Sequence, residues 1–96
     1  MTNKMEELLV KIQKMRKDKG WDVSDTPEIL AKSVFVEAGE LLECYLGEPD
    51  LEHIKSELAD VLMYALSLCV DLGLDPVDVV TSKFIDIDAR YPSKAP

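Results

Sequence analysis

Two pairs of acidic residues are spaced in this sequence so that each pair falls on one face of a helix. Glu37 and Glu40 are three residues apart, and so are Glu57 and Asp60. Residues at this spacing are neighbours on a helix surface, with Cβ atoms about 5–6 Å apart. The sequence therefore predicts two places where carboxylates converge, and converging carboxylates are typical ligands of a hard divalent cation.

Both pairs have apolar neighbours in the sequence, which reads Val-Glu-Ala around Glu37 and Ala-Asp-Val around Asp60. A buried carboxylate is destabilising unless a cation pairs with it. Two like charges about 4 Å apart repel by about 4 kcal/mol at an effective dielectric near 20, and a divalent cation reverses that sign. Because all the candidate ligands are carboxylates, we expect Mg²⁺, with Mn²⁺ or Ca²⁺ as alternatives, rather than Zn²⁺.

The segments that carry these pairs are expected to form an antiparallel helical hairpin. Apolar residues recur at steps of three and four over 3–19, 27–46, 49–72 and 76–88, which predicts four helices and no strand. The connection between the second and third helices is short, about residues 47–48, so the two must lie antiparallel. The acidic pairs are then level with each other and form one site. The alternative is a solvated acidic face with accidental spacing.

The third predicted helix is too apolar for a small monomer. Between residues 58 and 70 only Asp60 and Ser67 interrupt the apolar run, and a chain of 96 residues supplies only one modest core. We therefore predict an all-α fold with a single domain over 1–96 and a flexible tail at 93–96. It is expected to assemble as an intertwined homo-oligomeric helical bundle. The last helix is expected to contribute an apolar stripe to the core, formed by Val77, Val80, Phe84 and Ile87.

The composition excludes several classes of function. The formal net charge is −8, whereas domains that bind DNA or RNA usually need a basic surface. A small phosphate compound can still bind where metal ions neutralise its charge. No apolar run reaches about 18 residues, so no membrane span is expected, and the polar start gives no sign of a signal peptide. A cytoplasmic location is the default expectation. Cys44 and Cys69 are expected to be reduced core residues.

Four further residues are candidates for holding a ligand. Trp21 is the single tryptophan, and it either fills the core or offers a flat face to a base. Tyr64 lies one turn after Asp60, so its hydroxyl either packs in the core or reaches a ligand held by the metal. Lys83 and Arg90 flank the end of the last predicted helix, where they are either solvated or in contact with phosphate oxygens.

Other polar residues are expected at the surface. His53 lies on the polar first turn of the third helix, and Glu43 is expected at the rim of the acidic site rather than as a ligand. The second half of the first helix is basic, which suits the negative end of the helix dipole or provides a positive patch for an anionic ligand. These basic residues are Lys11, Lys14, Arg16, Lys17 and Lys19.

The acidic pattern and its surroundings resemble the MazG-type nucleotide pyrophosphohydrolases, whose signature is ExxE, a spacer and then ExxD. The matching stretches are Glu37-Ala-Gly-Glu40-Leu, Glu57-Leu-Ala-Asp60-Val-Leu-Met-Tyr64, Ser82-Lys83 and Arg90-Tyr91-Pro92. The resemblance covers nearly the whole chain, from Gly20 to Pro92. The Gly-Trp-Asp loop and the Arg-Tyr-Pro end are also similar to the dCTP pyrophosphatase branch of that superfamily.

This resemblance implies Mg²⁺-dependent hydrolysis of a nucleoside triphosphate, by analogy a deoxynucleotide, to a monophosphate and pyrophosphate in house-cleaning of the nucleotide pool. The implied metal ligands are Glu37, Glu40, Glu57 and Asp60. The residues near the phosphates or sugar are Tyr64 and Lys83, and Trp21 helps to enclose the base. From their position beside the metal, Glu37 or Glu40 is expected to orient the attacking water. The family builds its sites between the chains of a dimer or tetramer.

One position departs from the family pattern. Relatives commonly carry Asn four residues after the lysine that matches Lys83, and this chain has Ile87 there. The alternative function is therefore a non-catalytic nucleotide- or metal-binding helical module. A plain helical oligomerisation domain with solvated acidic pairs is a third interpretation.

Overall fold

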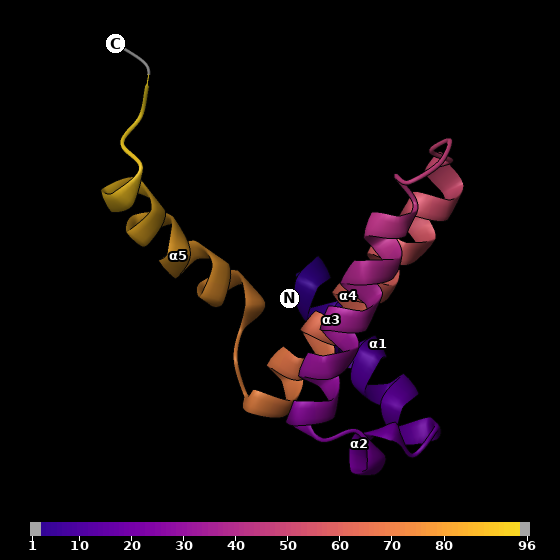
Figure 1. Cartoon of the computed structure of the whole chain (residues 1–96). Helices are drawn as coiled ribbons and strands as arrows, with labels where there is room; N and C mark the ends of the chain where they lie inside the picture. The colour runs from indigo at the N-terminus through magenta and orange to yellow at the C-terminus, as the bar shows by residue number, and fades with distance from the viewer. Residues whose placement is uncertain (1–2, 95–96) are drawn as a thin grey trace.

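The computed structural model describes residues 3–94, which form five α-helices (Figure 1). They are α1 (Lys4–Asp18), α2 (Trp21–Ser24), α3 (Pro27–Glu43), α4 (Leu51–Leu72) and α5 (Pro76–Arg90). The predicted all-α class is confirmed, and the four long helices lie where the apolar periodicity placed them. The flexible tail predicted at 93–96 lies partly outside the described residues, which end at 94.

Short polar residues and glycines begin and end these helices. The Thr26 hydroxyl accepts a hydrogen bond from the Ile29 N–H at 3.3 Å, and Pro27 occupies the first turn of α3. At α5 the Asp75 carboxylate accepts from the Val77 N–H at 2.8 Å. Such caps satisfy N–H groups that have no partner within the helix.

The helix α2 occupies the segment that was expected to be a loop. Gly20 has a positive φ of 74°, a backbone conformation that glycine adopts readily. The chain therefore turns sharply after α1, and the Gly20 carbonyl accepts hydrogen bonds from the Val23 and Ser24 N–H groups. The result is a single helical turn that begins at Trp21.

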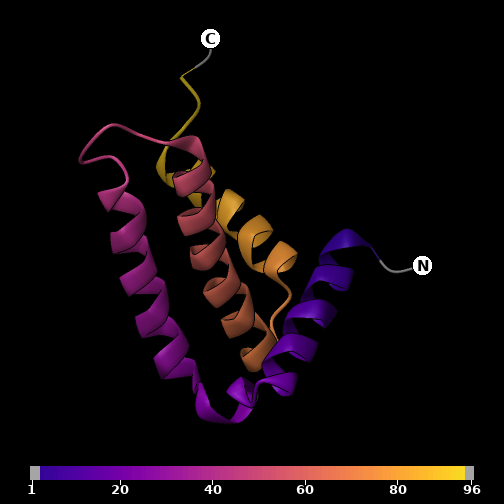
Figure 2. The same cartoon turned by 90° about the vertical axis from the view of Figure 1, so that its right-hand side faces the viewer.

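The helices α3 and α4 form the predicted antiparallel hairpin and run side by side (Figures 1 and 2). Their connection is longer than expected, because α3 ends at Glu43 rather than at residue 46 and α4 begins at Leu51 rather than at 49. Pro49 disfavours helical backbone in the residue before it, and the Asp50 carboxylate caps the start of α4 through the Glu52 N–H. The helix α1 packs against α2 and α4.

The buried core of a single chain is small. Among the described residues six are buried, and two of these are polar: Ile12, Arg16, Leu30, Cys44, Ser67 and Pro76. Both cysteines are free, as predicted, with Cys44 buried and Cys69 half-buried. Among the described helices none is long and apolar enough to span a membrane.

The helix α5 stands away from the other helices (Figure 1). Its apolar stripe was expected in the core of the chain, and that prediction is wrong: Val77, Val80, Phe84 and Ile87 are all exposed, by 41–59%. The physical reason is that α3 and α4 pack mainly against each other, and only the start of α5 lies near apolar residues of the other described helices.

Candidate metal centre and adjoining cavity

Three of the four predicted carboxylates meet across the α3–α4 hairpin. Glu37 and Glu40 come from α3 and Glu57 from α4, and each places one carboxylate oxygen within 4.8 Å of the other two. The i,i+3 spacing puts the first two on one face of α3, and the antiparallel packing brings Glu57 opposite them. Asp60, one turn further along α4, is exposed and lies outside this group of three.

Two oxygens of this cluster are buried without a hydrogen-bond partner among the described residues, namely Oε2 of Glu37 and Oε2 of Glu57. An unpaired buried oxygen is costly, and native proteins usually satisfy it. Six oxygens around Mg²⁺ at about 2.0–2.1 Å lie about 3 to 4 Å from one another, a range that the 4.8 Å limit of this cluster includes. The chemistry and spacing of the three donors therefore fit a hard divalent cation.

The surroundings of Glu37 in this cluster raise the pKa of its carboxyl group from 4.5 to about 7. The largest cause is a hydrogen bond with the Glu40 side chain, followed by burial and then by the negative charges of Glu40, Asp60 and Glu57. Each of these causes favours a proton on Glu37. A cation would act in the opposite direction, because carboxylates bind metals in their deprotonated form.

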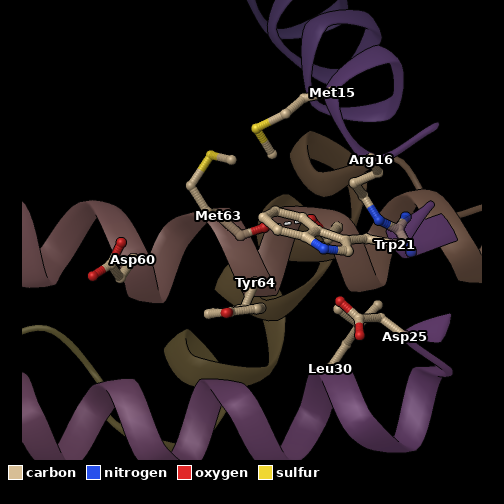
Figure 3. Close-up of a pocket in the computed structure, with 9 residues that line it drawn as sticks. Met15, Arg16, Trp21, Asp25, Leu30, Asp60, Met63 and Tyr64 are labelled. Atoms are coloured by element: carbon tan, nitrogen blue, oxygen red, sulfur yellow. Dashed lines mark hydrogen bonds between the residues drawn. The ribbon is translucent and has the colours of Figure 1, made fainter. Parts of the chain in front are cut away.

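A cavity of about 230 Å³ adjoins the cluster and ends at Asp60. Figure 3 shows eight of its lining residues with labels, drawn from α1, the α2 region, α3 and α4. The full lining comprises Met15, Arg16, Trp21, Asp25, Leu30, Asp60, Met63, Tyr64 and Ser67. Trp21 is 45% exposed, so it forms a wall of this cavity rather than a plug of the core. The structure thus places Trp21 and Tyr64 in one cavity with a predicted metal ligand.

The sequence matches the MazG nucleotide pyrophosphohydrolase domain over residues 25–93, a range that holds all four acidic positions. This chain belongs to the MazG nucleotide pyrophosphohydrolase family. Its fold is similar to the crystal structure of a pyrophosphatase from Archaeoglobus fulgidus, with a TM-score of 0.88 and 31% sequence identity. The alignment covers 97% of this chain and 96% of that one. No curated protein sequence matches the chain.

Membership of the MazG family supports a nucleotide pyrophosphohydrolase activity, and the geometry above shows which parts of this MazG chain lie together. The acidic cluster and the cavity occupy the hairpin and the α1–α2 turn. Trp21 lies before the matched range, yet the α2 turn brings it back over α4 (Figure 3).

Sequence reasoning missed the role of Arg16 in this MazG chain. Its side chain is 2% exposed and forms two hydrogen bonds with Asp71 of α4, at 3.0 and 3.2 Å. Of the two interpretations of the basic half of the first helix, a solvated position is wrong for Arg16, and a positive patch for an anionic ligand stays a prediction. A signal was present, because Arg16 follows Ile12 by four residues and so continues the apolar face of α1.

His53 was expected to be plain surface, and this expectation holds only in part. Its side chain is 59% exposed, but Nε2 lies 3.5 Å from Oε1 of Glu57 on the same face of α4. A protonated His53 would therefore pair with the cluster. Glu43 is exposed and lies outside the cluster, as predicted.

The hydroxyl group of Tyr64 is partly buried and is close enough to several carboxylates for their charges to affect its pKa. Burial raises the pKa of its hydroxyl, and the negative charges of Glu37 and Asp25 raise it further. The hydroxyl therefore stays protonated at neutral pH and can donate a hydrogen bond to a ligand.

Lys83 and Arg90 are not brought to the cluster within one chain. Both lie on α5 and pair with Asp86, each at 3.2 Å. Ile87, the departure from the family pattern, is exposed on the same helix. A role for Lys83 and Arg90 at the phosphates remains a prediction, and it requires α5 to reach the site of another chain.

Proposed function

We propose that this MazG-family chain hydrolyses a nucleoside triphosphate to the monophosphate and pyrophosphate, with Mg²⁺ as the required cation. The observation that carries this proposal is the pair of buried, unpartnered oxygens on Glu37 and Glu57 beside a cavity walled by Trp21. A cation site next to an aromatic cavity suits a ligand with a charged phosphate end and a flat base.

Glu37, Glu40 and Glu57 would hold the cation, and Asp60 would join them from the neighbouring turn of α4. A bound Mg²⁺ supplies positive charge that neutralises the phosphates and the charge developing on their oxygens. The carboxylate-only ligand set favours Mg²⁺, and Mn²⁺ is expected to substitute for it.

In the proposed reaction a water oxygen forms a bond to the α-phosphorus while the bond from that phosphorus to the bridging oxygen breaks. Pyrophosphate leaves with the bridging oxygen, and one proton of the water passes to a carboxylate. Glu37 or Glu40 is the proposed acceptor, because both carboxylates lie at the cation site, within reach of a water that the cation would hold. Tyr64 would donate a hydrogen bond to the bound nucleotide.

The resemblance to relatives that act on deoxynucleotides supports a deoxynucleoside triphosphate as substrate and house-cleaning of the nucleotide pool as the role. Lys83 and Arg90 on α5 of a second chain would bind the phosphate oxygens of the triphosphate.

The proposal is tested by incubating the protein with each NTP and dNTP, in Mg²⁺ and in EDTA, and measuring pyrophosphate. We expect release from at least one nucleotide in Mg²⁺, none in EDTA, and a loss of at least about 100-fold in Glu57→Gln, the size typical for removal of a group that organises the charge of the transition state. Glu43→Gln is the matched control, because Glu43 is exposed and outside the cluster. If no nucleotide yields pyrophosphate, the catalytic proposal is wrong.

A further inference from the structure

The cavity beside the metal cluster contains one charged side chain that the proposed reaction does not use. The Asp25 carboxylate lines this cavity and forms no hydrogen bond or ion pair with the described residues. Figure 3 shows it on the Leu30 side of the cavity, below the Trp21 ring, whereas Asp60 lies farther along α4 toward the cluster. Asp25 therefore belongs to the end of the cavity that is remote from the phosphate site.

The neighbouring basic group does not neutralise Asp25. Arg16 also lines the cavity, but its two terminal nitrogens are bound by Asp71, and one of them also contacts Gln13. Its Nε is buried without a partner among the described residues and forms no hydrogen bond with Asp25. Asp25 thus keeps its full capacity to accept hydrogen bonds, and an ionised carboxylate has no donor.

A second polar group of the cavity is also restricted to accepting. The Ser67 hydroxyl donates its proton to the Met63 carbonyl at 2.7 Å, and Ser67 is 5% exposed. A hydroxyl whose hydrogen is committed retains only its lone pairs. The cavity also has donors, because the Arg16 Nε–H is buried without a partner in the described part of the chain and the Tyr64 hydroxyl is protonated. Asp25 and Ser67 are therefore the groups of this lining that accept.

The size and walls of the cavity suit a nucleobase. A cavity of roughly 150 Å³ holds a benzene ring, so about 230 Å³ is room for a two-ring base. Trp21 supplies an aromatic face, and stacking on such a face does not by itself select among bases. Selection must then come from the hydrogen-bonding groups.

We propose that Asp25 selects the base, and that the favoured base is guanine. This inference rests on the proposed function, because it assigns the substrate class of the same site. Guanine carries two adjacent donors, N1–H and the N2 amino group, which match the two oxygens of one carboxylate. Adenine and cytosine place an acceptor atom beside their amino group, and thymine places a carbonyl on each side of its single N–H. In each of these three bases an acceptor atom would therefore face a carboxylate oxygen, which is also an acceptor, and the two would repel each other.

The inference is tested by comparing kcat/KM for dGTP, dATP, dCTP and dTTP in Mg²⁺. We expect dGTP to be the best substrate, with a kcat/KM at least about 10-fold higher than that for dTTP, because a bidentate contact to a base favours that base by about this factor. Asp25→Asn should lower kcat/KM for dGTP by about 10- to 100-fold and that for dTTP by less than about threefold. Asp22→Asn, which removes the same charge from α2 outside the cavity, should change neither. Equal losses for all four nucleotides in Asp25→Asn, or a natural preference for dTTP, would overturn the inference.

A binding measurement separates this inference from the proposed reaction. Quenching of Trp21 fluorescence reports on the cavity without turnover, because the chain has one tryptophan. dGMP should bind about 10-fold more tightly than dTMP, and Asp25→Asn should remove that difference. If no triphosphate is hydrolysed but dGMP is still preferred, the reaction is wrong and the base assignment stands. Equal quenching by dGMP and dTMP, or none by either, overturns the base assignment.

Discussion

Glu37 lies among other carboxylates, and no basic side chain of the described residues is bound to it. Its carboxyl group shares a hydrogen bond with Glu40 and faces Glu57 and Asp60, and these neighbours raise its pKa to about 7. The i,i+3 spacing of the acidic residues predicted the convergence. Sequence could not predict which of the four residues would be most buried, because this depends on how α3 rotates against α4.

Removing one charge from the cluster should stabilise the metal-free protein. In EDTA at pH 8, Glu40→Gln is expected to raise the melting temperature, because the introduced amide can donate to the Glu37 carboxylate instead of repelling it. The same variant should lose the stabilisation that Mg²⁺ gives. Glu43→Gln, one turn along α3, should shift the melting temperature much less; equal shifts in the two variants would mean that the effect is only one of net charge.

The stability of the metal-free protein should fall as pH rises from about 4.5 to about 7. Between these values folded Glu37 holds a proton that an unfolded Glu has already lost. The folded state then binds more protons than the unfolded state, and its free energy of unfolding decreases with rising pH. Thermal melts in EDTA across this range should show a shallower decrease in Glu37→Gln than in the natural protein. An unchanged slope in that variant would contradict the assignment of the pKa.

At the scale of elements, α1 is held to the hairpin by a buried ion pair. Arg16 is 2% exposed and Asp71 19% exposed, so most of the pair is shielded from water. The sequence correctly predicted four long helices, since apolar periodicity and capping residues are local signals. It missed this pair because the two residues are 55 positions apart, and no local pattern links them. For the same reason it gave no sign that Asp25 and Ser67 line one cavity.

Breaking the buried pair should be far more damaging than breaking an exposed one. Arg16→Met is expected to lower the free energy of unfolding by about 3 kcal/mol, because Asp71 is left shielded without its partner. The matched control is Lys14→Met, since Lys14 pairs with Asp18 at 2.8 Å with both side chains more than half exposed; it should cost less than about 1 kcal/mol. Urea unfolding measures both values. A loss below about 1 kcal/mol for Arg16→Met would mean that the pair does not hold α1 in place.

At the scale of the whole molecule, a single chain leaves much apolar surface exposed. The residues of the α5 stripe are 41–59% exposed, and Leu58 and Leu62 of α4 are 43% and 50% exposed. The long apolar run in the α4 segment of the sequence led to the prediction that a second copy of the chain covers part of this surface. It did not distinguish a stripe buried within one chain from a stripe exposed on it, because periodicity reports an apolar face and not what covers that face.

A homo-oligomer should therefore depend on α5. Phe84→Asp is expected to convert the assembly to monomers, measured by light scattering during size-exclusion chromatography, because a charge would be buried at the centre of the stripe. Activity should fall with it if Lys83 and Arg90 act on the site of another chain. Ser82→Asp, on the opposite side of α5 by helical spacing, should leave the assembly intact. A natural protein that is monomeric at all concentrations would contradict this account of α5.

The most direct test of the metal centre is the melting temperature of the natural protein as a function of Mg²⁺ concentration. A ligand that binds only the folded state stabilises it by about 2.7 kcal/mol at about 100 times its dissociation constant, which corresponds to a rise of several degrees in a domain of this size. We predict such a saturable rise in the natural protein and in Glu43→Gln, and its absence in Glu57→Gln. A melting temperature of the natural protein that does not change with Mg²⁺ would contradict the assignment of Glu37, Glu40 and Glu57 as a cation site.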